Sequence, residues 1–256
     1  MKRGDSAVIT VSLALAAVVV ASVTFSLLVQ DREPNSQATV SGSSVSSLLV
    51  MTWGPSLCKV EPSNRGCRSG HVGRLGQSFI LHGLWPQPSS EQYCDVPREV
   101  ARRARNLGDP VPAVKLPPDL QASLSQQMSD ASVMTPHEWY AHGTCSGVTP
   151  PEYFGIASSF SSEVSKVLDP VFGKAEGRRL APRTVRESID AAFGDGAGRR
   201  VGLSCRQVGD DTLVYEVRFS LPPVVDLRDD PAPASLAESL ADGPTIPPGC
   251  GSGRVP

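Results

Sequence analysis

The sequence of 256 residues carries almost no net charge. Its 24 basic and 26 acidic side chains give a formal charge of -2, and because the first 46 residues hold three charges of each sign, the remainder also carries about -2. This balance excludes the class of proteins that hold a polyanion through a large excess of positive charge. Any affinity for a polyanion must come from local contacts, with a shallow salt dependence.

Histidine is also scarce: two of only four histidines lie in one stretch, TPHEWYAHGTCSG, from Thr135 to Gly147. This stretch lacks H-E-x-x-H, the zinc-binding motif of many metalloproteases. The second histidine follows the first by five residues, which separates them by about 140° around a helix, whereas a spacing of four returns both to one face. A zinc protease of this kind is therefore excluded.

The N-terminus has the pattern of an export signal. Lys2 and Arg3 precede an apolar segment from Ala7 to Val29 that only Ser and Thr interrupt. A cleaved signal needs about 7 to 15 apolar residues and a membrane span about 20, so residues 1–29 fit either a signal cut after Ala21 or an uncleaved signal-anchor. Both alternatives place the folded part outside the cytoplasm, secreted or anchored by residues 7–29.

Polar, small residues without periodicity predict a flexible linker at residues 30–47. The following residues 48–256 are numerous enough for one soluble domain with its own core, and 40% of the chain is apolar.

The chain contains an even number of cysteines. Six cysteines in an exported chain favour three disulfides over metal ligation, but six cysteines permit 15 pairings and their spacing selects none of them. A catalytic thiol at Cys145, beside His142, is an alternative that would leave one cysteine unpaired. The six are Cys58, Cys67, Cys94, Cys145, Cys205 and Cys250.

The start of the histidine-rich stretch predicts a helix N-terminus. Thr135 fits the N-cap, Pro136 the first helical position and Glu138 the partner in a capping box, and Gly143 would end the helix. His137 would then lie in the first turn, where free N–H groups favour a bound phosphate. The capping box alone also explains Glu138, and packing in a core would explain the histidines.

A second unusual stretch, FILHGLWP, runs from Phe79 to Pro86. Three apolar residues lead into His82, and Gly-Leu-Trp-Pro follows. The pattern predicts a buried strand that ends at His82 and a turn that presents Trp85.

Together the two stretches resemble the signature segments F-T-I-H-G-L-W-P and H-E-W-x-K-H-G-T-C of the T2 family of secreted ribonucleases. The resemblance is close around these segments and looser over most of the chain from Leu48 to Cys250. It implies that Trp85 binds substrate by stacking on a base and that the disulfides join Cys94 to Cys145 and Cys205 to Cys250, which leaves Cys58 with Cys67. It further implies four catalytic residues: His82, His137, Glu138 and His142.

The activity that this resemblance implies is extracytoplasmic cleavage of single-stranded RNA to 2′,3′-cyclic phosphate ends, followed by their hydrolysis. Imidazoles with pKa near 6.5 can make both proton transfers without a metal or other cofactor, with His142 as base and His82 as acid. His137 would hold the phosphate and Glu138 would orient it. We expect a monomer that contacts RNA, and a membrane only through an N-terminal anchor.

One position departs from the family pattern, since Ala141 stands where the family usually has Lys. Loss of one group that stabilises transition-state charge commonly costs about 10²–10³ in rate. We expect a slower enzyme unless Arg102 or Arg103 reaches the site. The alternative is a catalytically weak relative that binds RNA or acts as an inhibitor.

The remaining pattern predicts an α+β fold, with a mainly antiparallel sheet packed against several helices and stabilised by disulfides. Residues 48–53 read as a central strand that pairs with residues 78–82, and the segment from Cys58 to Gly76 as a loop next to a solvated His71. A strand over 212–221 would bury Leu213, Tyr215, Val217 and Phe219 on one face. We further expect helices over 97–106, 118–128, 153–168 and 184–193, a strand over 201–205 and irregular chain from Pro222.

Overall fold

The computed structural model describes residues 44–228 and 234–256. The predicted signal or anchor at residues 1–29 and most of the predicted linker lie outside these residues. Within the described ranges, no helix is long and apolar enough to cross a membrane. The first strand, β1 (Ser46–Trp53), begins two residues before its predicted start at Leu48.

One sheet organises the described part of the chain, in the strand order β2-β1-β5-β6-β3, with β4 paired to β5 off this path. The pairs β1–β2, β1–β5 and β4–β5 are antiparallel, and β6 joins β5 in parallel at Leu213 and Arg254. The predicted α+β class and the central position of β1 are therefore confirmed. The other strands are β2 (Phe79–Gln87), β3 (Arg179–Leu180), β4 (Val201–Val208), β5 (Asp211–Leu221) and β6 (Gly253–Arg254).

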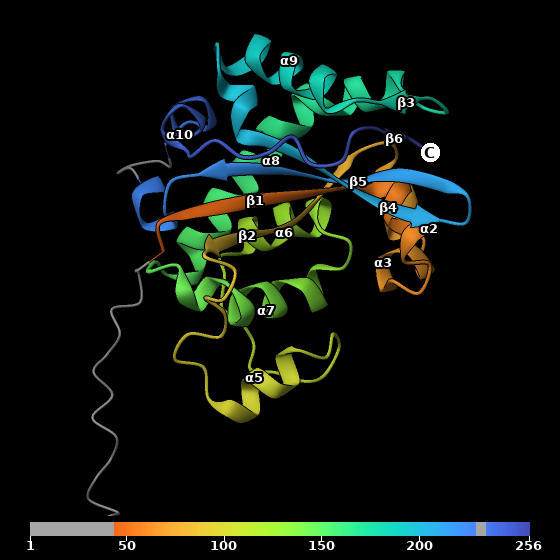
Figure 1. The fold of residues 1–256 in the computed structure, drawn as a ribbon. Helices are drawn as coiled ribbons and strands as arrows, with labels where there is room; N and C mark the ends of the chain where they lie inside the picture. The colour runs from red at the N-terminus through yellow and green to blue at the C-terminus, as the bar shows by residue number, and fades with distance from the viewer. Residues whose placement is uncertain (1–43, 229–233) are drawn as a thin grey trace, which may run out of the picture. The chain divides into compact units, whose positions relative to one another are not determined.

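The helix α8 (Pro150–Lys174) packs on the sheet and forms the main core with it. It lies behind the strands in the view of Figure 1, with α7 and α5 below β2 and α9 above the sheet. Its large apolar side chains fill the core, and each fully buried one contributes about 1.5–3 kcal/mol, whereas Val167 is only partly buried. The fully buried ones include Phe154, Ile156, Phe160, Val164 and Leu168. Phe172 near its end packs against Trp53 of β1 and Phe79 of β2, with ring centroids 5.1 and 4.6 Å away.

A β-bulge interrupts β2 at its histidine. Gly83 pairs with Val50 of β1 and Leu81 pairs with Met51, so His82 is an extra residue with no partner in this register. A bulge shifts the alternation of faces by one residue. The predicted end of the strand at His82 is wrong, because the strand continues past the bulge to Gln87.

A second bulge interrupts β5. Glu216 pairs with Ser204 of β4 and Val214 pairs with Cys205, so Tyr215 is the extra residue. Val214 and Val217 both face the main core, whereas Tyr215 belongs to a smaller cluster on the other face of the sheet. The predicted single buried face with strict alternation is wrong, because the bulge changes the alternation and both faces are covered.

The predicted loop between Cys58 and Gly76 is also wrong, since the segment after β1 folds into three short helices, with His71 half-buried at the start of the third. The helix α9 begins at Pro182, two residues before its predicted start, and Glu187 pairs with Arg183. The segment after Pro222, predicted as irregular, contains η3 and α10. The remaining bounds are α2 (Gly54–Val60), α3 (Arg65–Arg68), α4 (His71–Leu75), α5 (Arg98–Ala104), α6 (Pro118–Gln127), α7 (Ala131–Ala141), η1 (Gly143–Cys145), α9 (Pro182–Phe193), η2 (Ala197–Arg200), η3 (Val224–Leu227) and α10 (Leu236–Asp242).

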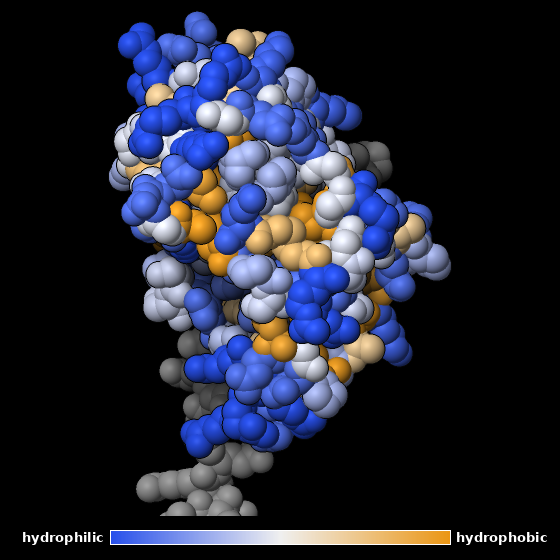
Figure 2. All heavy atoms as spheres, turned by 90° about the vertical axis from the view of Figure 1, so that its right-hand side faces the viewer, coloured by the Kyte–Doolittle hydropathy of each residue, from blue (hydrophilic) through white to orange (hydrophobic). Residues whose placement is uncertain are grey.

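Three disulfides join Cys58 to Cys67, Cys94 to Cys145 and Cys205 to Cys250, the pairs that the resemblance implies. The last of them fastens the C-terminal segment to β4. Figure 2 shows the side on which α3 lies: hydrophobic residues gather at mid-height, where the sheet lies in Figure 1, and hydrophilic residues cover most of the surface above and below.

Candidate active site

The helix α7 starts one turn earlier than its sequence predicts. Asp130 is the N-cap, and its side chain accepts a hydrogen bond from the backbone N–H of Ser132. Thr135, the predicted cap, is buried inside the helix and directs its hydroxyl to the sulfur of Met128, 3.7 Å away. Pro136 therefore lies within the helix, where it leaves out one backbone hydrogen bond.

This start changes the surroundings of His137. The first turn of the helix comprises residues 131–134, and the N–H groups of 132–134 donate to Asp130. The predicted place of His137 in the first turn, beside free N–H groups, is therefore wrong. The His137 ring is held instead from α5, since its Nδ1 donates to the carbonyl of Ala104 at 2.7 Å. The other ring nitrogen, Nε2, lies 4.0 Å from Oε1 of Glu138.

Glu138 is fully buried and is not a capping residue. Its Oε2 accepts a hydrogen bond from Trp85 Nε1 at 2.9 Å. Its Oε1 has no hydrogen-bond partner among the described residues, and lies between Nε2 of His82 at 3.8 Å and Nε2 of His137 at 4.0 Å. An unpaired oxygen of a buried carboxylate is costly. The two imidazoles thus converge on one carboxylate oxygen.

His142 lies at the point where α7 ends. As the C-cap it leaves helical geometry, with φ -129° and ψ -46°, and its ring stacks on Trp85 with centroids 5.1 Å apart. Burial lowers the pKa of His142, the charges of His137 and His82 lower it further, and Glu138 opposes them. The neutral form of this imidazole is therefore favoured.

Trp85 lies between two of the histidines. One ring face stacks on His142, and the ring meets His82 edge to face with centroids 5.1 Å apart. His82 and Trp85 are three residues apart, so in a regular strand they would point to opposite faces of the sheet; the bulge brings them to the same face. The indole holds the catalytic candidates in place, and its predicted stacking on a base remains a prediction.

His82 has a partner that the sequence pattern did not reveal. Its Nδ1 lies 3.2 Å from Oε1 of Glu216 on β5. Burial alone would lower the pKa of His82, but this hydrogen bond and the charges of Glu138, Glu216 and Glu61 raise it above its ordinary value. The sequence signal that could have identified this partner is a Glu that stands two residues before an Arg inside a mainly apolar strand.

Gly83 leaves the room that the site needs. A Cβ at this position would lie 1.9 Å from Oε2 of Glu138 and 2.7 Å from Nε1 of Trp85. Any side chain here would separate the hydrogen-bonded pair, so the glycine of the FILHGLWP stretch is required by close approach.

Ala141, the departure from the family pattern, is only 2% exposed, and its carbonyl accepts a hydrogen bond from the N–H of Tyr93. The two arginines predicted as replacements, Arg102 and Arg103, both pair with Glu99 on α5.

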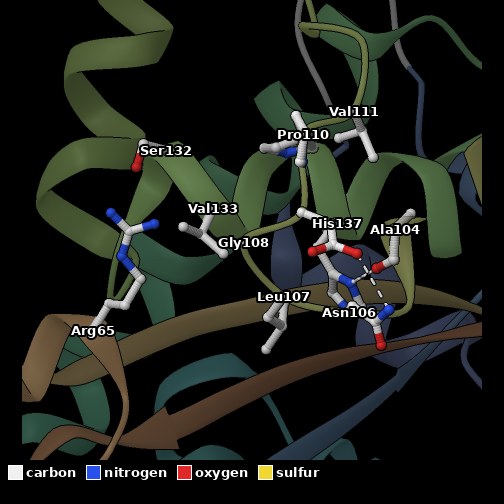
Figure 3. A pocket seen from close by; sticks show the side chains of 12 residues that line it. Arg65, Ala104, Asn106, Leu107, Gly108, Pro110, Val111, Ser132, Val133 and His137 are labelled. Atoms are coloured by element: carbon white, nitrogen blue, oxygen red, sulfur yellow. Dashed lines mark hydrogen bonds between the residues drawn. The ribbon is translucent and has the colours of Figure 1, made fainter.

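Two pockets flank the histidines. The first, of about 190 Å³, extends from His137 along the segment that follows α5 to Arg65 (Figure 3). The second, of about 150 Å³, lies beside His82 and is lined by Glu61 and Tyr215. Leu107, which is 58% exposed, borders both. A chain that passes the histidines would have room on either side.

Comparison with known proteins identifies relatives of this chain. It is 28% identical to Intracellular ribonuclease LX of Solanum lycopersicum over 61% of this chain and 64% of that protein. It is 27% identical to Ribonuclease MC of Momordica charantia over 66% of this chain and 84% of that protein. With Ribonuclease I of Escherichia coli the identity is 26% over 68% and 74% of the two chains.

Solved structures share the fold. The crystal structure of RNase NT in complex with 5′-AMP aligns with a TM-score of 0.53 and 18% identity, covering 82% of this chain and 95% of that chain. A variant of RNase MC1 in complex with 5′-GMP aligns with a TM-score of 0.50 and 22% identity, covering 70% and 90%. The family model described as Ribonuclease T2 family matches residues 45–230. This match spans most of the chain and contains every residue of the site, and the protein belongs to the ribonuclease T2 family.

Proposed function

We propose that the protein is an endoribonuclease that cleaves single-stranded RNA without a metal, first to 2′,3′-cyclic phosphate ends and then by hydrolysis. The observation that carries this proposal is the convergence of His82 and His137 on one oxygen of Glu138, with His142 stacked on the indole that binds the same carboxylate. The named relatives are ribonucleases, which agrees with this chemistry.

The surroundings of His142 and His82 support opposite roles for these two residues. The base must be neutral to take the proton of the 2′-hydroxyl, and the pKa of His142 is lowered by its burial. The acid must be protonated to supply the leaving 5′-oxygen, and despite burial the pKa of His82 is raised by Glu216 and Glu138. Environments that move two pKa values apart separate a base from an acid. We therefore assign His142 as base and His82 as acid in the first step, with the roles reversed in hydrolysis.

In the same proposal, His137 holds the phosphate and Glu138 orients or polarises it. His137 has its Nδ1 proton committed to Ala104, so its Nε2 is the atom that faces the substrate as a donor when the ring is protonated. Glu138 orients both imidazoles. The nucleotides on either side of the scissile phosphate occupy the two flanking pockets.

We also propose that the folded part works outside the cytoplasm, secreted or held by residues 7–29. Three disulfides within the described residues suit an oxidising compartment. Fractionation of the producing cells, with mass spectrometry of the mature N-terminus, tests both the location and the cut after Ala21.

The central experiment is incubation of the purified protein with single-stranded RNA in EDTA, with analysis of the product ends. We expect cyclic phosphate ends that later open, and no cleavage by a His142→Ala variant. Loss of wild-type cleavage in EDTA would instead indicate a metal-dependent hydrolase. Retention of intact RNA without cleavage would favour the weak RNA-binding relative that Ala141 suggests.

A further inference from the structure

Glu216 is a carboxylate in the middle of the sheet, and only 2% of the residue is exposed. A buried carboxylate is costly unless charged or hydrogen-bonding partners satisfy both oxygens. Here Oε2 accepts from Nη2 of Arg218 at 2.9 Å and Oε1 faces Nδ1 of His82 at 3.2 Å. The side chain therefore connects a cation to the proposed general acid.

The two residues of this pair meet across a strand. His82 lies on β2 and Glu216 on β5, and β1 runs between them, with Thr52 opposite Glu216. Ile80 of β2 and Glu216 of β5 both pair with Thr52, so the three lie on one face of the sheet. His82 follows Ile80 by two residues, so the alternation of the strand turns its ring to the same face. The bulge at Tyr215 places Tyr215 on this face as well.

The contact determines which ring nitrogen carries the proton. An ionised carboxylate only accepts hydrogen bonds, so Nδ1 of His82 must be the donor. Although burial would raise the pKa of Glu216, its bonds to His82 and Arg218 lower it, which keeps it ionised. With Nδ1 committed, Nε2 is the atom that faces Glu138 Oε1.

We propose that Glu216 is a positioning residue for His82: it holds the ring, keeps a proton on Nδ1 and stabilises the imidazolium whose Nε2–H protonates the leaving oxygen. Its catalytic meaning rests on the proposed function, but the pairing itself does not. The other charged or titratable groups around this ring are Glu138 and His137 of α7, its C-cap His142, Glu61 beyond α2, and Tyr215 and Arg218 of β5.

The first test measures protonation of His82 directly, by NMR titration of its ring Cε1–H in the full protein. Glu216→Gln keeps an oxygen that can accept from Nδ1–H and removes the charge, so we expect the pKa of His82 to fall. Arg218→Gln removes the cation that offsets Glu216, so we expect the pKa to rise. An unchanged titration in both variants overturns the proposal. Glu187→Gln, which removes an exposed carboxylate on α9, serves as the control and should change nothing.

The second test is the pH dependence of RNA cleavage. In Glu216→Gln we expect kcat to fall about 10-fold or more, which is part of the total factor of about 10²–10⁴ that a general acid contributes. We also expect the alkaline limb of the pH–rate profile to move to lower pH, because the pKa of His82 falls. KM should change little, because Glu216 is buried behind His82. A rise in KM with unchanged kcat and an unmoved limb would overturn the proposal. If the wild-type protein cleaves no RNA, the proposed function fails while the NMR titration still decides the pairing.

Discussion

At the scale of single residues, the site depends on small side chains as much as on titratable ones. Gly83 illustrates this, because a methyl group there would occupy the place of the Glu138 carboxylate. We expect Gly83→Ala to reduce kcat for RNA cleavage strongly while the fold is retained, since the displaced groups belong to the site. Steady-state kinetics and near-UV circular dichroism measure the two effects.

The matched control is Gly155→Ala in α8, where an added Cβ meets nothing within 4 Å. A glycine-to-alanine change at an unstrained helical position stabilises a protein by about 0.4–1 kcal/mol through the unfolded state. Full activity in this variant and also in Gly83→Ala would show that the close approach at residue 83 is unimportant.

Ala141 gives a second prediction at this scale. We expect Ala141→Lys to raise kcat by about 10-fold or more, because an ammonium near the phosphate would replace a lost charge-stabilising group that commonly contributes about 10²–10³. Ala141→Met adds comparable length without the charge and separates electrostatics from crowding at this buried position. Equal rates for the Lys and Met variants would mean that a cation at residue 141 has no role.

The two histidine-containing segments were enough to select His82, His137, Glu138 and His142, and the structure brings these four together. Glu216 could not be selected in the same way. In a strand with strict alternation it falls on the side opposite the core, where a charged residue needs no explanation. Its contact with His82 depends on the pairing of β1 with both β2 and β5, which are distant in sequence.

At the scale of elements, α7 carries three of the four catalytic candidates, so its N-cap matters. The local pattern at Thr135 satisfied every rule for a helix start, yet Asp130 supplies a cap five residues earlier. Tertiary burial of Thr135 decided between the two. The four longer strands, β1, β2, β4 and β5, and the long helix α8 were predictable because their apolar patterns extend over several residues. The two-residue strands β3 and β6, single caps and bulges give no such extended signal.

Asp130→Ala should therefore destabilise the protein by about 0.5–2 kcal/mol, the usual cost of a lost N-cap. Urea denaturation followed by circular dichroism measures it. Asp130→Asn retains the capping oxygen but removes the ion pair with Arg65, which lies 3.4 Å away and is mostly exposed, so it should cost far less. Equal losses in the two variants would assign the effect to the ion pair.

At the scale of the whole molecule, a formal charge of -2 gives the enzyme little long-range attraction for RNA. The local cations proposed to contact the scissile phosphate are the imidazolium groups of His82 and His137. For single strands, the logarithm of the binding constant falls by about 0.7 per neutralised phosphate for each tenfold rise in salt concentration. We therefore expect a slope shallower than about -2 for log(kcat/KM) against log[salt]. Measurement at fixed pH from low to high NaCl concentration checks this, and a much steeper slope would reveal an unrecognised basic surface.

The bulge at His82 also limits how this site can be transplanted. A protein engineer who copies the FILHGLWP side chains onto a uniform strand of a designed scaffold would obtain an imidazole and an indole on opposite sides of the sheet. In this site the number of residues along the strand is as much a part of the catalyst as their identity.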